Sequence, residues 1–254
     1  MTTPPGKLIL MPNTLDFGVN GEADLQEVLP LGAIRIAARL THWVAENAKT
    51  TRAFLKRVDA VVPLAQPLQA LSIVELPRPP KGTRVVALPD LKPLIQPALQ
   101  GHDIGLISEA GLPAVADPGA ALVQAAHALG VRVEALAGPS SLLLALAASG
   151  LNGQSFAFVG YLPVDAMQRG TRIRELEALS RRAGQTQQMI ETPYRNEALL
   201  AALLTHLRGD TQLSVSCGLT LPQAWTRTDA VAQWKAHTSQ MPADVPAVFS
   251  LLAP

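Results

Sequence analysis

The pattern of apolar residues in the sequence predicts an α/β protein. Short apolar runs of strand length alternate with longer stretches of helical apolar spacing along the whole chain. The clearest case is 103–149, where strand, turn, helix, strand, turn and helix follow one another, with the first strand at 103–108 and the first helix at Ala120–Leu129. The two turns are expected at the carboxyl ends of neighbouring parallel strands, where open α/β sheets bind their ligands.

Before this unit, an apolar strand is expected at Lys7–Met11, and a helix from about Glu22 to Leu40 that is interrupted or kinked at Pro30. Eight prolines lie between Pro63 and Pro97, so this segment is expected to be irregular, because proline is excluded from helix interiors and central strands. The other N-terminal elements are expected to be a strand at Thr41–Ala45, a turn at Glu46-Asn47, a helix at Thr50–Val58, and short edge strands at Leu71–Leu76 and Arg84–Leu88.

From Val131–Leu136, the second strand of the unit, the chain runs through Gly138-Pro139 into a helix at Leu142–Ser149. The expected strands after it are Phe156–Gly160, Gln188–Glu191, Leu213–Cys217 and Ala247–Leu252. The expected helices are Ala166–Arg182, Tyr194–Leu207 and Val231–Ala236. The Gly138-Pro139 turn separates two strand–helix sets, which places a domain boundary between 1–138 and 139–254.

Composition argues against several classes of protein. A net charge of +1 gives no overall basic field that would draw the chain to nucleic acid, and the single cysteine, Cys217, excludes an intramolecular disulfide framework. The five histidines share no metal-ligand spacing, so no metal site is expected, and no G-x-G-x-x-G follows the first strand. The chain has no signal-peptide core and no apolar run long enough to span a membrane, so a cytoplasmic protein without a membrane partner is expected.

Motifs along nearly the whole chain resemble one known family. The central ones are Ser108-Glu109-Ala110-Gly111-Leu112-Pro113, Asp117-Pro118-Gly119 and Leu136-Ala137-Gly138-Pro139-Ser140-Ser141. They are similar to the tetrapyrrole methylase superfamily, whose members use S-adenosylmethionine, and most of all to its branch of ribosomal RNA small subunit methyltransferase I, which methylates 2′ oxygens. The resemblance implies two α/β domains, a cofactor in the cleft between them, and a homodimer.

The motifs that diverge lie on the side that the family uses for its substrate. The family's Pro-Thr-Pro-Ile-Gly-Asn after the first strand is here Pro12-Asn13-Thr14-Leu15-Asp16-Phe17, and its Glu-Asp-Thr-Arg is Glu46-Asn47-Ala48-Lys49. Pro12 and Glu46 are therefore the substrate-side candidates. The retained motifs lie on the cofactor side, and the resemblance implies these cofactor-binding residues: Ser108, Glu109, Ala110, Gly111, Pro113, Gly138, Pro139, Ser140, Ser141 and Glu191.

These residue types suit the cofactor. Gly111 and Gly138 lack a Cβ, so their backbone can approach a ligand closely. Ser140 and Ser141 precede a helix and offer hydroxyl and amide donors to a carboxylate or ribose, and Glu109 can accept from ribose hydroxyls or balance a cation. No catalytic residue is assigned, because methyl transfer from a sulfonium depends mainly on in-line positioning.

The sequence thus predicts an S-adenosylmethionine-dependent methyltransferase that acts on RNA, of the 2′-O-methylating type, or on a small molecule. A cluster of arginines between Arg169 and Arg182 is diluted by glutamates, so RNA binding, where present, is expected to be weak. The divergent motifs leave a second hypothesis open, in which the chain binds the cofactor as a regulatory protein and has lost catalysis.

Overall fold

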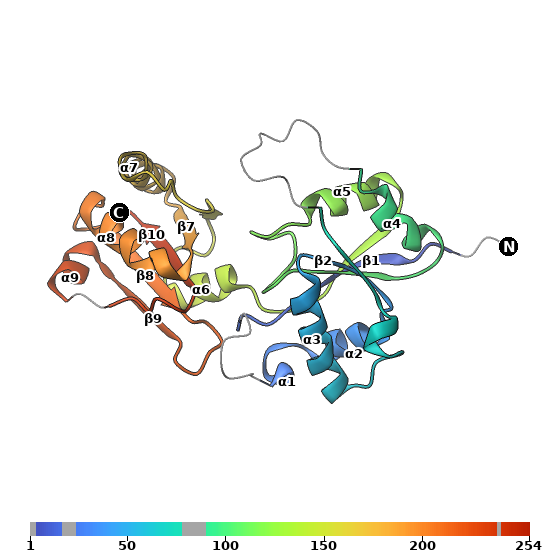
Figure 1. The fold of residues 1–254 in the computed structure, drawn as a ribbon. Coiled ribbons are helices and arrows are strands. Elements are labelled where there is room, and N and C mark those ends of the chain that lie inside the picture. The colour runs from blue at the N-terminus through green and yellow to red at the C-terminus, as the bar shows by residue number, and fades with distance from the viewer. Residues whose placement is uncertain (1–3, 17–23, 78–89, 238–239) are drawn as a thin grey trace. The chain divides into compact units, whose positions relative to one another are not determined.

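The computed structural model describes residues 4–16, 24–77, 90–237 and 240–254. The chain divides into two compact units, Met1–Pro139 and Ser140–Pro254 (Figure 1). Within the described ranges each unit carries one five-stranded sheet with helices packed against it. The predicted α/β class is therefore confirmed, and each unit is described by itself below.

The sheet of the first unit is parallel throughout, in the order β3-β2-β4-β1-β5. Its strands are β1 (Lys7–Met11), β2 (His42–Ala45), β3 (Ser72–Glu75), β4 (Ile104–Ile107) and β5 (Arg132–Ala135). β1 pairs with β4 on one side and with β5 on the other. The expectation that β4 and β5 are neighbours is wrong, because the chain crosses over β1 after β4. The segment after β1 consequently lies between the two predicted ligand-binding turns.

Two pairs of helices sandwich this sheet. α2 (Leu31–Arg39) and α3 (Ala48–Val61) cover one face, where Ile34, Phe54 and Leu55 pack with Ile9 of β1. α4 (Lys92–Leu99) and α5 (Ala120–Ala128) cover the other face, with Ile95 and Leu122 packed against Leu8 and Leu106. β1 sends alternate apolar side chains to both cores, as expected of a parallel strand that is buried on both faces.

Pro30 interrupts the helix expected from Glu22 to Leu40, which is one of the two alternatives predicted. The chain forms two helices, α1 (Leu25–Val28) and α2, because Pro30 ends the first and starts the second; Glu22 itself lies outside the described residues. Another N-terminal expectation needs correction. The segment up to Pro97 is not wholly irregular: besides a single turn, η1 (Leu68–Ala70), it contains α4. Pro93 lies in the first turn of α4, where its missing N–H costs nothing, and burial of Ile95 and Ala98 stabilises the helix. The edge strand expected at Arg84–Leu88 lies outside the described residues.

The sheet of the second unit is mixed, in the order β6-β7-β10-β8-β9. Its strands are β6 (Phe156–Phe158), β7 (Thr186–Glu191), β8 (Gln212–Cys217), β9 (Trp225–Ala230) and β10 (Ala247–Leu252). Only β6 and β7 are parallel to each other, and the remaining pairs are antiparallel. β9 was not predicted, because its residues are half-buried and polar at most positions, so it shows no apolar run.

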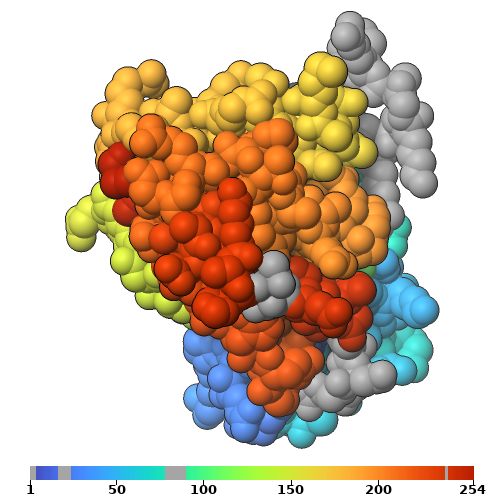
Figure 2. All heavy atoms as spheres, turned by 90° about the vertical axis from the view of Figure 1, so that its left-hand side faces the viewer, coloured from blue at the N-terminus to red at the C-terminus, as the bar shows by residue number. Residues whose placement is uncertain are grey.

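The two faces of this sheet differ. α7 (Ala166–Ala183), α8 (Asn196–His206) and α9 (Val231–Ala236) cover the apolar face, where Ile173, Leu203 and Trp234 pack with Met189 and Phe249. Figure 2 shows these three helices at the surface of the unit, coloured yellow to red. α6 (Ser141–Ser149) covers the other face, which carries polar side chains such as Gln188 and Ser250. Within the described ranges, no helix is long and apolar enough to cross a membrane.

Candidate functional site at the carboxyl edge of the first sheet

The loops that follow β1, β2, β4 and β5 lie at one edge of the first sheet, because all four strands run in the same direction. The loops after β1 and β4 are bonded to each other. The amide of Asn13 donates to the carbonyl of Gly111 (2.8 Å), and the amide of Gly111 donates to the carbonyl of Thr14 (3.3 Å). The Asn13 side chain also donates to the carbonyls of Ser108 (3.1 Å) and Glu109 (3.0 Å). Asn13 thus fixes the backbone of the predicted cofactor turn, a role that sequence reasoning missed.

The two glycines of the predicted site differ in what they require. Gly111 has a φ of +64°, a left-handed conformation that residues with a Cβ rarely adopt, and an added Cβ would make only ordinary contacts there. At Gly138 an added Cβ would lie 2.1 Å from Cβ of Pro12. The ring of Pro12 therefore fills the space that a side chain at position 138 would need, so the packing of this turn requires a glycine there. Cofactor binding by the Gly138 backbone stays a prediction. Pro12 itself is buried and serves as a packing partner of this turn.

A buried ion pair holds the end of the loop after β1. Arg57 of α3 contacts Asp16, with Nη2 3.0 Å from Oδ2, and the side chains are 17% and 6% exposed. The Thr14 hydroxyl donates to Asp16 Oδ1 (2.8 Å), and Arg57 Nη1 lies 3.4 Å from the same hydroxyl. Because the carbonyl of Thr14 accepts from Gly111, the ion pair is connected to the predicted cofactor turn.

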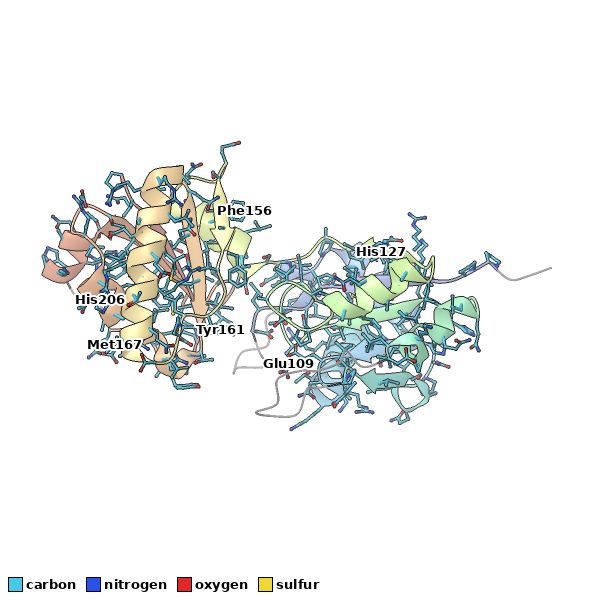
Figure 3. The ribbon with its side chains drawn as sticks, turned by 90° about the horizontal axis from the view of Figure 1, so that it is seen from above. Glu109, His127, Phe156, Tyr161, Met167 and His206 are labelled. Carbon is cyan, nitrogen blue, oxygen red and sulfur yellow. The ribbon has the colours of Figure 1, made fainter. Side chains whose placement is uncertain are left out.

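Three carboxylates meet at this edge, from the loops after β2 and β4. The Glu46 carboxylate accepts from the amide of Glu109 (3.0 Å), and the Glu109 carboxylate accepts from the side chain of Asn47 (3.1 Å). Asn47 caps the N-terminus of α3 with its side-chain oxygen, so its amide group is held toward Glu109. Glu109 is half-buried, at the unit's loop-rich edge (Figure 3). Glu46 thus contacts the predicted cofactor turn.

Asp117 completes this group. The pKa of Asp117 is raised to about 6, mainly by burial; the neighbouring carboxylates of Glu46 and Glu109 add to the shift, and the hydrogen bond with the Ser108 side chain opposes it. An ionised Asp117 is therefore costly in the free protein, and a nearby positive charge would relieve that cost. The sequence placed Asp117 in a turn motif without a role; its pKa depends on Glu46, which is distant in the chain.

The remaining predicted residues of this turn are buried, and their cofactor-binding role stays a prediction. The Ser108 hydroxyl donates to the carbonyl of Ala110 (3.0 Å), and Ser108, Ala110 and Pro113 are all buried. In the described part of the chain, no group of three or more His, Cys, Asp or Glu side chains is placed to hold a metal ion.

The second unit contributes its own predicted residues. Ser140 is the N-cap residue of α6, yet its side chain makes no capping hydrogen bond, and Ser141 begins the helix. The first-turn amides of α6 therefore receive no side-chain acceptor from Ser140, which suits an anionic ligand group. Glu191 is different: its carboxylate accepts from the amide of Thr192 (2.9 Å) and pairs with Arg195 (2.9 Å). The Glu191 side chain is 1% exposed and is bonded within the chain.

The sequence comparisons give consistent results. The family model of Tetrapyrrole (Corrin/Porphyrin) Methylases matches residues 29–231. The chain is 38% identical over 146 residues to ribosomal RNA small subunit methyltransferase I of Mesorhizobium japonicum, covering 57% of this chain and 48% of that protein. It is 31% identical over 188 residues to the protein of the same name from Halalkalibacterium halodurans, covering 74% and 58%. The chain thus spans about half the length of the curated relatives that it matches.

A solved structure supports the fold. The crystal structure of uroporphyrin-III-C-methyltransferase from Thermus thermophilus has a TM-score of 0.52 to this chain, at 19% identity. The match covers 97% of this chain and 92% of that one, so both units are included. Because the family model extends across most of the chain and from one unit into the other, this protein belongs to the tetrapyrrole methylase family.

Proposed function

We propose that the chain is an S-adenosylmethionine-dependent methyltransferase whose acceptor is RNA of the small ribosomal subunit. The family is one of methylases, and the relatives that the chain matches are named as methyltransferases of this RNA. One observation on the site supports the cofactor: the carboxylates of Glu46, Glu109 and Asp117 gather at the ligand-binding edge, and the raised pKa of Asp117 favours a cationic ligand there.

The residues present fit this cofactor. S-adenosylmethionine supplies a methyl group on a sulfonium, which is activated toward a nucleophile. Its positive charge suits the three carboxylates, and Glu109 can also accept from ribose hydroxyls. The proposal further uses the backbone around Gly111 for close approach, and the donors at Ser140 and Ser141 for the cofactor's carboxylate. The chain's contribution to the reaction is then to position the acceptor oxygen and exclude water.

A cofactor-binding protein without catalysis is the second candidate, and the loop after β1 favours it. This loop diverges from the family on the substrate side, and the polar side chains of Asn13, Thr14 and Asp16 are bonded within the chain. Closure of the loop on itself reduces the number of groups that it offers to an acceptor.

Two measurements separate these candidates. Isothermal titration with S-adenosylmethionine and its demethylated product measures cofactor binding. Transfer of a radiolabelled methyl group into small ribosomal subunits, free small-subunit RNA and small-molecule fractions of a cell extract measures catalysis. Binding with transfer into the RNA supports the proposal, transfer into small molecules alone moves the acceptor to that class, and binding without any transfer supports the second candidate. Absence of binding would contradict both.

The resemblance also suggests a homodimer in the cytoplasm. Sedimentation equilibrium of the purified chain tests the dimer, and fractionation of cells that produce it tests the compartment. A monomer across the accessible concentration range would remove the dimer from the proposal.

A further inference from the structure

Both tyrosines of the chain, Tyr161 and Tyr194, are exposed at one edge of the second sheet. They follow β6 and β7, which are parallel neighbours, and this pairing continues to the bond from the amide of Ile190 to the carbonyl of Gly160 (3.2 Å). Tyr161 is 57% exposed and Tyr194 is 77% exposed. On soluble proteins, several exposed apolar side chains close together mark an interaction site more often than a single exposed apolar residue does.

The segment that carries Tyr161 is held firmly by its neighbours. Leu162, the next residue, is buried in the main core of the second unit. Asp165 caps α7 by accepting from the amide of Gln168 (2.9 Å), and the Arg169 side chain donates to the carbonyl of Val164 (3.1 Å). The exposure of Tyr161 is therefore a property of an ordered loop. Val164 in this loop and Met167 in the first turn of α7 are also exposed; Tyr161 and Met167 are labelled in Figure 3.

The backbone around Tyr194 is also held in place by contacts within the chain. It lies in the single turn η2 (Pro193–Arg195), which the Glu191 carboxylate holds through the amide of Thr192 and the guanidinium of Arg195. Asn196 follows, fully buried, with its side chain donating to the carbonyl of Val245 (2.9 Å). The ring of Tyr194 thus projects from a fixed base, so binding through it requires little ordering of the chain.

An arginine bonded to the Tyr161 loop favours an anionic partner. Arg169 donates to the carbonyl of Val164 in this loop, it has no carboxylate partner among the residues that the structure describes, and its Nε is buried without a hydrogen-bond acceptor. Exposed aromatic rings together with arginines are the combination that binds single-stranded nucleic acid, by stacking on bases and neutralising phosphates.

We propose that Tyr161 and Tyr194 form a stacking platform for unpaired bases of the RNA acceptor, with Arg169 facing the adjoining phosphate. This inference rests on the proposed function and identifies the surface of the second unit that receives the acceptor. It requires RNA with unpaired bases, because a ring can stack only on a base whose face is open.

The test measures binding of two fluorescent probes by anisotropy: a single-stranded oligoribonucleotide from small-subunit RNA, and the same strand annealed to its complement. Tyr161→Ala and Tyr194→Ala should each weaken single-strand binding about 5- to 150-fold, which corresponds to about 1–3 kcal/mol per stacked base. Duplex binding should change little. Tyr194→Trp should retain single-strand binding, since it keeps an aromatic face.

Phe156→Ala is the matched control, because Phe156 is an exposed aromatic residue (40%) at the opposite end of β6. Melting temperatures and S-adenosylmethionine affinity of all variants should equal those of the parent.

If the parent binds the single strand and both alanine variants bind it equally well, this inference fails while the proposed function stands. If the parent binds no RNA, the RNA acceptor fails and the inference fails with it. If both variants keep RNA binding and lose self-association, the surface belongs to a second copy of the chain, which also overturns the inference.

Discussion

Different side chains line two edges of the molecule. One is the carboxyl edge of the first sheet, and the other is the edge of the second sheet at which β6 and β7 end. At the first, carboxylates and amides are half-buried and bonded to one another, as Glu109 is to Asn47. At the second, the rings of Tyr161 and Tyr194 stand exposed on a rigid base. The first arrangement suits a small cationic ligand held by many polar contacts, and the second suits a large partner held by stacking. We therefore expect the first edge to bind the cofactor and the second edge to bind the larger acceptor.

The largest effect is expected at the ion pair beneath the first edge. Arg57→Ala leaves the 6%-exposed carboxylate of Asp16 without its guanidinium, and such losses typically cost about 3–5 kcal/mol. Urea unfolding measures the change. Arg52→Ala, an exposed arginine on the same helix, should change stability by less than about 0.5 kcal/mol. Equal effects of the two changes would show that the ion pair does not support the first edge.

Gly138→Ala tests whether this glycine serves packing. The new Cβ would overlap the Pro12 ring, so the free energy of unfolding should fall by about 1–3 kcal/mol even without a ligand. Gly153→Ala is the control, since a Cβ there meets nothing within 4 Å. Pairing Gly138→Ala with Pro12→Gly removes the opposing ring and should restore part of the loss. An unchanged unfolding curve for Gly138→Ala would show that packing against Pro12 does not require a glycine here.

Asp117 should make cofactor binding depend on pH. The protein holds a proton on this carboxyl up to about pH 6, and a cationic ligand favours the ionised form, so binding releases a proton below that pH. S-adenosylmethionine affinity should therefore rise several-fold as pH increases through 6, and Asp117→Asn should flatten the rise. In the free protein the sign is opposite: the stability that protonated Asp117 contributes is lost as pH rises from about 4 through 6. Titrations across this range with both proteins decide the point.

Ser140→Ala is a gentler probe of the second unit's contribution to cofactor binding. It removes one hydroxyl, worth about 0.5–1.5 kcal/mol if it bonds the cofactor. Affinity should fall several-fold, while the melting temperature of the free protein stays nearly the same, because this hydroxyl makes no capping bond. Calorimetry on the folded variant measures both. A parent-like affinity would remove Ser140 from the site.

The smallest effect concerns salt. α7 carries arginines that are partly paired, as Arg172 is with Glu175, so few phosphates can be neutralised. RNA affinity should therefore fall only slightly as the salt concentration rises. Alanine at Arg169, Arg172 and Arg174 should lower the RNA affinity and reduce its salt dependence still more. Strong salt dependence that survives these changes would place RNA binding away from α7.

Local patterns predicted most elements and few of the contacts at the site. β1 and β4 were predictable because strands buried on both faces are continuous apolar runs. α4 was missed since its prolines outweighed its buried Ile95, a tertiary effect. The roles of Asn13 and Arg57 depend on partners distant in the chain, as in the bond from Asn13 to Glu109, and no spacing in the sequence encodes them.

The central position of β1 has a consequence for synthesis. The strand Lys7–Met11 leaves the ribosome long before its partners: in the described part of the chain it pairs with Ile104–Ile107 and Arg132–Ala135. At about 5–20 residues per second, it must wait on the order of ten seconds for its first partner. During that time an apolar segment stays unpaired and exposed to chaperones or to other nascent chains. Folding of the first unit is therefore expected to be slow and to begin only after β4 has emerged.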